Sequence, residues 1–372
     1  STNKIVNINQ MAKIRAIAFY LPQYHPTKEN DEWWGKGFTE WTNVAKARPL
    51  FKGHIQPHIP ADLGFYDLRL SESREAQAAL AQKYGIEGFC YWHYWFGNGK
   101  RLLERPFNEV LKSGKPDFPF CLAWANHSWM KKLWDPNATF KDKLLMEQTY
   151  PGDDDIKAHF YTVLPAFQDK RYITVNGCPL FLIYAPLDYK EVSRFIEMWR
   201  SLALQNGLKG IYFVGQGGMP FRSKILSLGF DAFNDATVFG IKGKENKIGL
   251  TLRKIIARLL KYPITYRYKD AMKYWIYSEA KMSDTIPTII PNWDHSPRSG
   301  AKGFILTGAT PKLFQKHVKE IIELIKDKNE EERIVFIKSW NEWGEGNYLE
   351  PDLQYGCEKL KILNEIISKR EI

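Results

Sequence analysis

Short, continuous runs of apolar residues recur along the chain and predict a set of buried β-strands. Most of these runs do not alternate apolar with polar residues, and strands that are buried on both faces of a parallel sheet have this pattern. We expect eight strands, over residues 14–20, 88–95, 118–124, 179–186, 210–217, 231–239, 285–294 and 333–340.

The segments between these runs carry the spacing of amphipathic helices. Residues 71–85 open with Ser71, a predicted N-cap, and stop at Gly85. A second helix, over residues 311–328, places one apolar stripe opposite its lysines, and residues 360–367 repeat the pattern. The stripe of the second helix consists of Phe314, Val318, Ile321, Ile322 and Ile325. These are the features of surface helices that pack on a sheet.

Strand and helix alternate eight times, which predicts an α/β fold, a single (β/α)8 TIM barrel with extended βα loops. This fold commonly needs about 250 residues and tolerates long insertions, and the chain has 372 residues. We assign residues 14–372 to the catalytic barrel and residues 1–13 to an N-terminal extension. The alternative is an open doubly wound sheet, but no glycine-rich nucleotide-binding motif follows the first strand.

Polar and aromatic residues gather where seven of the eight predicted strands end. A TIM barrel builds its active site at these carboxyl ends, and flat rings beside amides and acids suit the faces and hydroxyl groups of a sugar. Read singly, the histidines also fit hydrogen-bonded loop residues, and the aspartates also fit helix caps. The candidate stacking rings are Trp41, Trp95, Trp124, Trp129 and Trp293. The candidate hydroxyl-binding residues are Tyr20, Gln23, His25, His93, Asn126, Gln216, Asp235, Asp294 and Asn341.

The segment SWNEWGEG, residues 339–346, follows the last predicted strand and contains Glu342 and Glu345. On a turn, residues three apart can point into one pocket, and Trp340 and Trp343 make this pocket apolar. Two carboxyl groups in such a pocket cannot both ionise easily, so their pKa values separate. One then acts as a protonated acid and the other as an ionised base, which is the division that glycoside cleavage requires. We predict that Glu342 and Glu345 are the catalytic pair.

Six segments, taken together, resemble the WbsX-like proteins of bacterial surface-polysaccharide gene clusters. They read AFYLPQYHP, WWGKGFTEWTNV, GFCYWHYWF, LAWANHSW, PLFLIY and SWNEWGEGNYLEP, and the resemblance extends from residue 14 to residue 367. The chain is also similar, more distantly, to glycoside hydrolase family 99, the endo-acting α-mannosidases and mannanases.

The resemblance implies a barrel enzyme that cleaves α-mannose-type linkages with retention and without a metal or cofactor. It implies that Glu342 takes a proton from the sugar's own 2-hydroxyl, whose oxygen attacks the anomeric carbon and gives a 1,2-anhydro sugar. Glu345 then protonates the leaving oxygen and afterwards activates water. The 2-oxygen must lie opposite the leaving group, so we expect an α-manno or α-rhamno sugar in a bacterial surface polysaccharide or mannan. The hydrolases typically carry His where Gly344 stands, which leaves the contacts to the substrate open.

Two other functions are open: a glycosyltransferase of O-antigen, lipopolysaccharide or capsule synthesis, and a barrel that binds glycan without cleaving it. A metal-dependent sugar-nucleotide transferase is expected to carry a D-x-D-type motif. Its only candidate, residues 153–155, opens a predicted helix far from the strand ends and fits an N-terminal cap with solvated charges. A protein that only binds has no need of two crowded carboxyl groups.

The positive charge of the chain is concentrated in one segment. The formal net charge is +11, and residues 241–285 hold eleven Lys/Arg against four Asp/Glu. The stretch GLTLRKIIARLLKY in this segment has the pattern of a basic amphipathic helix. This pattern predicts a peripheral contact with an anionic membrane or with a lipid-linked oligosaccharide or acidic polysaccharide. An ordinary barrel helix, with its apolar stripe packed inward and its basic face in solvent, explains the same pattern equally well.

Composition excludes several other partners and sites. No nucleic-acid-binding module accompanies the basic segment, so we expect no nucleic acid partner. The four cysteines show no zinc spacing, so no metal site is predicted. No apolar run is long enough to span a membrane. We therefore expect a cytoplasmic protein, or one peripheral to the inner membrane face, and a periplasmic one if a signal peptide has been removed.

Overall fold

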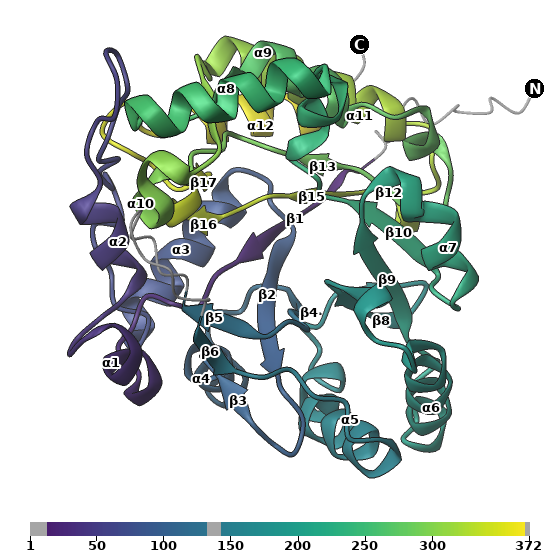
Figure 1. Cartoon of the computed structure of the whole chain (residues 1–372). Helices are drawn as coiled ribbons and strands as arrows, with labels where there is room; N and C mark the ends of the chain where they lie inside the picture. The colour runs from purple at the N-terminus through teal and green to yellow at the C-terminus, as the bar shows by residue number, and fades with distance from the viewer. Residues whose placement is uncertain (1–12, 132–142, 369–372) are drawn as a thin grey trace, which may run out of the picture.

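The computed structural model describes residues 13–131 and 143–368, and these residues form a nearly closed parallel barrel surrounded by helices (Figure 1). Nine strands follow one another around it in the order β12-β10-β9-β8-β4-β2-β1-β15-β13. Their bounds are β1 Arg15–Tyr20, β2 Gly88–Trp95, β4 Phe120–Trp124, β8 Cys178–Ile183, β9 Tyr212–Gly217, β10 Ala232–Asp235, β12 Thr285–Ile286, β13 Thr288–Ile289 and β15 Ile334–Ile337. The predicted TIM barrel is confirmed.

The predicted seventh strand is broken in two at Pro287. Proline has no N–H to give to a strand ladder, so the pairing changes partner at this residue. The β12 half pairs with β10 on one side, and the β13 half pairs with β15 on the other. The Pro287 carbonyl still accepts a hydrogen bond from the Phe336 N–H, at 3.1 Å. The two short strands therefore fill one position, and nine strands make an eight-position barrel.

A helix follows each strand position, and most of these helices bury one side against the outside of the barrel. The helix predicted to begin near residue 71 has Ser71 as its first helical residue. Its N-cap is Leu70, which supplies no side-chain hydrogen bond. The prediction that Ser71 is the N-cap was therefore wrong. The helices of the eight units are α3 Ser71–Lys83, α4 Arg105–Ser113, α5 Asp153–Phe167, α6 Val192–Gln205, α7 Arg222–Ser227, α8 Lys247–Leu260, α11 Pro311–Ile325 and α12 Glu358–Ile367.

One apolar core lies between the strands and these helices, and its buried residues run from Ile14 to Ile367. The stripe predicted on α11 is buried at Phe314, Val318, Ile321 and Ile325, whereas Ile322 is only half-buried. The smaller elements in the loops are α1 Lys28–Trp34, α2 Glu40–Lys46, β3 Arg101–Leu102, β5 Trp129–Lys131, β6 Lys143–Met146, β7 Thr174–Val175, β11 Thr265–Arg267, α9 Tyr268–Ala271, α10 Ser296–Ser299, β14 Ile305–Thr307, β16 Asn341–Glu342 and β17 Asn347–Tyr348.

Barrel closure brings the first, seventh and eighth βα loops together. Strand β15 pairs with β1 on one side and with β13 on the other. The loop after β1 carries α2, the loop after β13 carries α10, and the loop after β15 carries β16 and β17. These three loops contact one another, and Figure 1 shows α2, α10 and β16 as neighbours at the same end of the barrel. Segments almost 300 residues apart thus meet where the site is expected.

The basic amphipathic helix is present as α8, but it does not pack its apolar stripe on the barrel. None of its residues is buried. Six of its seven large aliphatic side chains are between 48% and 78% exposed: Ile248, Leu252, Ile255, Ile256, Leu259 and Leu260. The alternative of an inward-packed stripe is therefore wrong. Within the described residues, no helix is long and apolar enough to cross a membrane.

Candidate active site

The two predicted catalytic glutamates lie on a short hairpin-like turn directly after β15. Glu342 ends β16, and Glu345 ends a 3-10 turn over Trp343–Glu345. Gly346 follows with φ +61°, a left-handed conformation that favours glycine, and an added Cβ there would lie 2.8 Å from Asp294 Cβ. The turn is fixed to the seventh loop by the Asp294 N–H, which donates to the Glu345 carbonyl at 2.6 Å.

One arginine joins both glutamates. Arg298 in α10 donates from Nη1 to Glu345 Oε1 at 2.8 Å and from Nη2 to Glu342 Oε2 at 2.9 Å. Its Nε donates to Glu40 Oε1 of α2 at 2.7 Å. A guanidinium group has a planar set of donors, which lets a single side chain hold several carboxylates in place. Glu342 and Glu345 therefore belong to one ion cluster, and its third acid, Glu40, and its cation, Arg298, come from two other loops.

The close approach of Glu40 depends on the absence of a side chain at Gly344. A Cβ built on Gly344 would lie 1.8 Å from Glu40 Oε1 and 2.8 Å from Arg298 Nε. No real Cβ contact is that short, so any larger residue would displace the ion pair. This gives a structural reason for the glycine at position 344.

Burial and charge crowding shift the proton equilibria of this cluster. Burial, followed by the nearby Glu345 carboxyl, raises the pKa of Glu342 to about 8, against the opposing effect of Arg298. The pKa of Arg298 rises well above its usual value, because the attraction of Glu40, Glu342 and Glu345 outweighs the effect of its burial. Buried Lys338 also feels Glu345 and Glu342, although desolvation lowers its pKa. Glu342 therefore holds its proton more tightly than an ordinary glutamate does.

A buried network holds the turn from behind. The side chain of Asn341 accepts from the Leu21 N–H at 2.7 Å and donates to the Leu21 carbonyl at 3.0 Å and to Tyr66 Oη at 3.2 Å. Glu350 accepts from Tyr66 Oη at 2.6 Å and from Trp343 Nε1 at 2.8 Å. Burial raises the pKa of Glu350 to about 7. Asn341, predicted to bind substrate, instead ties the end of β1 to the catalytic turn.

Of the other predicted site residues, Gln23 contacts the cluster through its side chain, which donates to Glu40 Oε2 at 3.4 Å. Asp294 accepts hydrogen bonds from His54 at 2.7 Å, from Gln56 at 2.9 Å and from the Ser296 N–H at 2.9 Å. It therefore fixes the start of α10, the helix that carries Arg298. The N-cap of that helix is His295, so the alternative that Asp294 caps a helix is wrong. The pKa of Asp294 is lowered by these hydrogen bonds, although burial acts in the opposite direction.

A second group of predicted residues is buried in an aromatic cluster between β2, β4 and α5. His93 shares a 2.8 Å hydrogen bond with His159, and burial holds the pKa of both imidazoles well below the usual value. The ring of Trp95 stacks on His159 at 4.7 Å, and its Nε1 donates to Asp155 Oδ2 at 3.1 Å. Trp124 Nε1 donates to the Trp95 carbonyl at 2.9 Å. These rings stabilise the barrel wall and offer no free face to a sugar.

The remaining candidates are also largely enclosed. Trp41 donates to the Tyr66 carbonyl, Tyr20 to Gln77, Gln216 to Asn234, and Asn126 to the Ala185 carbonyl. His25, Asp235 and Trp293 are buried, and Trp129 is half-buried against Tyr94. Burial lowers the pKa of His25 and raises that of Asp235. Four of them keep a buried atom that has no hydrogen-bond partner among the described residues: His25 Nδ1, Asp235 Oδ2, Trp129 Nε1 and Trp293 Nε1.

Sequence reasoning missed Glu40, Arg298 and Lys338, and it missed the two aromatic residues Tyr184 and Trp92. Burial and then Glu345 raise the pKa of Tyr184, whose side chain is 40% exposed. The Tyr184 ring meets half-buried Trp92 edge to face at 5.7 Å. Both residues lie in or directly after predicted strands, so strand ends were a usable signal for them. Arg298 and Glu40 lack such a signal, because only barrel closure places their loops together.

The barrel has the fold of glycoside hydrolases. A solved glycoside hydrolase-like protein matches with a TM-score of 0.60 and 16% identity, over 99% of this chain and 97% of that one. The GH99 endo-α-mannosidase of Bacteroides thetaiotaomicron matches with a TM-score of 0.57 and 15% identity, over 95% of this chain and 96% of that one. At these identities the likeness establishes a glycosidase-like fold and nothing finer.

The sequence itself defines the family. The family described as "Glycosyltransferase WbsX" matches residues 16–363, and the chain therefore belongs to it. The resemblance inferred from the sequence motifs is confirmed. An uncharacterized protein, WxcX, of Xanthomonas campestris pv. campestris is 34% identical over 359 residues. That match covers 95% of this chain and 49% of the WxcX protein, so the chain spans about half the length of this curated relative.

Proposed function

We propose that the protein is an endo-acting, retaining glycoside hydrolase or transglycosylase. The proposed substrates are α-manno or α-rhamno linkages in a bacterial surface polysaccharide or mannan. The proposal rests on one observation: Glu342 and Glu345 lie on one turn after β15, at the carboxyl end of the barrel, and both accept hydrogen bonds from Arg298. Two positioned carboxyl groups supply the acid and base of glycoside cleavage, and burial distinguishes Glu342 by raising its pKa.

The proposed first step breaks the glycosidic bond. The Glu342 carboxylate takes the proton of the 2-hydroxyl while the 2-oxygen forms a bond to the anomeric carbon. The bond from that carbon to the leaving oxygen breaks, and Glu345 gives this oxygen its proton. A pKa of about 8 makes Glu342 a stronger base than an ordinary carboxylate, but only in the fraction of molecules in which it is ionised.

The second step opens the 1,2-anhydro sugar. The Glu345 carboxylate takes a proton from water, or from a sugar hydroxyl in transglycosylation, and the oxygen attacks the anomeric carbon. The bond between that carbon and the 2-oxygen breaks, and the 2-oxygen regains its proton from Glu342. Arg298 keeps the two carboxyl groups in position and offsets their charge throughout. Two inversions at one carbon give net retention.

A glycosyltransferase is the second candidate, because the name of the family describes one. The acids of residues 153–155 give this candidate little support. Asp153 forms an ion pair with Arg194, and Asp155 accepts from Trp95 Nε1 at 3.1 Å and from the Asn98 N–H at 2.7 Å. These contacts hold α5 to the barrel wall, so at least two of the three acids are engaged in the fold.

The proposed reaction is tested by incubating the protein with yeast mannan and with O-polysaccharides rich in α-mannose or α-rhamnose. We expect released oligosaccharides in the mass spectrum, and no cleavage of a matched 2-deoxy substrate, which lacks the internal nucleophile. Efficient cleavage of the 2-deoxy substrate would exclude the anhydro-sugar route. Sugar transfer from a nucleotide sugar without depolymerisation would select the transferase.

The outward-facing apolar side of α8 supports a peripheral contact with a membrane, where lipid-linked glycans are found. Six exposed aliphatic side chains lie on a helix within a segment of net charge +7, and this combination suits an anionic lipid surface. We expect co-sedimentation with phosphatidylglycerol vesicles at low salt. Replacing Ile248, Leu252 and Leu259 by Ser should abolish it, whereas an intact pellet fraction for this variant would remove the proposal.

A further inference from the structure

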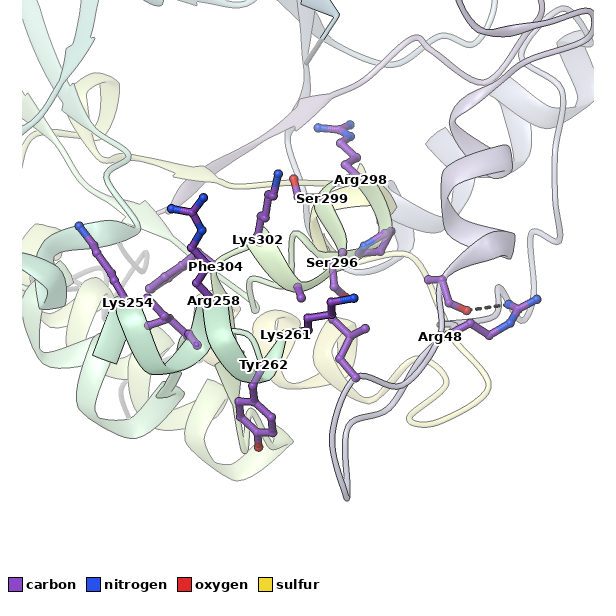
Figure 2. Close-up of a pocket in the computed structure, with 18 of the residues that line it drawn as sticks. Arg48, Lys254, Arg258, Lys261, Tyr262, Ser296, Arg298, Ser299, Lys302 and Phe304 are labelled. Carbon is purple, nitrogen blue, oxygen red and sulfur yellow. Dashed lines mark hydrogen bonds between the residues drawn. The ribbon is translucent and has the colours of Figure 1, made fainter. Parts of the chain in front are cut away.

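A large cavity lies beside the catalytic cluster, between α8 and α10. Its volume is about 950 Å³, and it is enclosed by the end of α2, by α8 and by residues 296–304. Figure 2 shows Lys254, Arg258 and Lys261 on the α8 side and Ser296, Ser299 and Lys302 opposite them. Of the residues that line the cavity, the proposed cleavage step uses only Arg298, although the cavity is large enough for a substituent of the glycan.

The lining of the cavity is strongly cationic. Lys46 and Arg48 line it from the end of α2, and Lys242, Lys254, Arg258 and Lys261 line it from α8 and the turn before it. Lys302 and Arg298 complete a set of eight basic residues, and no described Asp or Glu is among the lining residues. Partial burial and the neighbouring Lys254 lower the pKa of Lys242. Cations this crowded favour a multivalent anion.

Helix α8 turns a basic face towards the cavity and an aliphatic face towards the solvent. The positions that line the cavity are Leu250, Lys254, Ala257, Arg258 and Lys261, whose spacing of three or four residues places them on one face. The exposed aliphatic residues 248, 252, 255 and 259 have the same spacing on the opposite face. Lys254, Arg258 and Lys261 make no ion pair with any described residue, so they are available to a ligand.

Arg298 connects the cavity with the catalytic pair. It lines the cavity, and its guanidinium group contacts Glu40, Glu342 and Glu345. An anion bound beside α8 would therefore lie on the opposite side of Arg298 from the sugar that Glu345 protonates. The three carboxylates already neutralise Arg298, so the attraction for an anion comes from the other basic residues.

We propose that this cavity binds the diphosphate group of a glycan donor or acceptor and thereby sets its register at the catalytic pair. The inference rests on the proposed function, because it names the class of substrate for the same site. A diphosphate occurs both in lipid-linked glycans and in nucleotide sugars, and its two charged phosphates match the density of cations. The exposed aliphatic face of α8 lies on the other side of the same helix, where a lipid chain could rest.

Calorimetric titration of the purified protein with inorganic pyrophosphate tests the inference. We expect saturable binding that becomes at least about tenfold weaker in the double variant Lys254→Gln/Arg258→Gln, because each lost charge-assisted hydrogen bond has an effect of that order. The matched control is Lys244→Gln/Lys247→Gln, which removes the same charge from exposed residues outside the cavity. Its affinity should equal that of the wild type. Both variants change exposed side chains, so both should fold, and their melting temperatures should be measured to check this.

Parallel titrations with farnesyl diphosphate and with GDP distinguish the two sources of the diphosphate. Tighter binding of farnesyl diphosphate would identify a lipid-linked glycan, and tighter binding of GDP would identify a nucleotide sugar. Absence of pyrophosphate binding, or equal weakening in both double variants, would overturn the inference. Because the readout is binding, it is independent of turnover. If glycans are cleaved but pyrophosphate does not bind, only the cavity inference fails. If pyrophosphate binds but no glycan is cleaved, only the proposed function fails.

Discussion

Replacing Glu345 by Gln should reduce turnover on the cleaved glycan by roughly 10²–10⁴-fold, which is the usual effect of removing a positioned acid or base. Glutamine has the shape of the glutamate but can neither give a proton to the leaving oxygen nor take one from water. Arg298 would retain Glu40 and Glu342 as partners, so the fold should persist. Steady-state rates and the melting temperature measure the two effects separately.

Glu342→Gln should have an effect of the same size, and it should also change the pH dependence. A carboxyl group with a pKa of about 8 is protonated below that pH and cannot accept the 2-hydroxyl proton. The first step also needs a proton on Glu345, so below pH 8 the active form differs from the resting form only in which of the two groups holds the proton, and its fraction does not depend on pH. Wild-type kcat/KM should therefore fall above about pH 8, where this shared proton is lost. The variant should lack the fall at this pH, and an unchanged fall in the variant would assign it to another group.

The matched control for both variants is Glu72→Gln. Glu72 is an exposed residue in the first turn of α3, and it forms no ion pair with another described residue. Its rate and pH profile should equal those of the wild type. Near-wild-type turnover in Glu345→Gln or Glu342→Gln would remove that residue from the catalytic pair, whatever its place in the ion cluster.

Gly344→Ala should be nearly inactive even though it adds a single methyl group next to the catalytic residues. The new Cβ would lie 1.8 Å from Glu40 Oε1, so Glu40 and with it Arg298 must move. A displacement of about 1 Å in a positioning group can lower a rate by about 10²-fold. We expect a loss of that order in kcat/KM, together with a lower melting temperature. Rates and thermal unfolding at one pH measure both.

Two comparisons isolate the cause of this loss. At Gly243 an added Cβ would meet nothing within 4 Å, so Gly243→Ala should behave as the wild type. In the background of Glu40→Ala, Gly344→Ala should cost little further stability, because the colliding carboxylate is gone. If the two substitutions lowered the melting temperature additively, the predicted collision between positions 344 and 40 would be refuted.

The pattern of apolar runs was sufficient for the barrel but not for its details. Strand 88–95 was predicted to the residue, because a run buried on both faces has clear ends. The runs 231–239 and 285–294 were predicted too long. In the first, the strand ends at Asp235, whose carboxylate accepts from the Thr237 N–H and starts a turn. In the second, Pro287 interrupts the ladder, although the residues on both sides of it keep a strand-like composition.

Glu342 and Glu345 could be proposed together from the sequence because they are neighbours on one turn. Their partners could not, since Glu40 and Arg298 are 258 positions apart and come together only when the first and seventh loops meet. The surroundings of the tryptophans at strand ends could not be predicted for another reason. A large ring beside polar residues has the same sequence whether it faces a cleft or packs inside the protein, and Trp95 and Trp124 are both buried.

The pairing of β1 with β15 has a consequence for the timing of synthesis. The barrel wall cannot close around the site until residues 334–337 have left the ribosome and met residues 15–18. Glu40 emerges early, yet its cation follows 258 residues later and the glutamate pair later still. A nascent chain therefore carries no assembled acid–base machinery during most of its translation. Any glycan chemistry begins only after synthesis has passed Glu345.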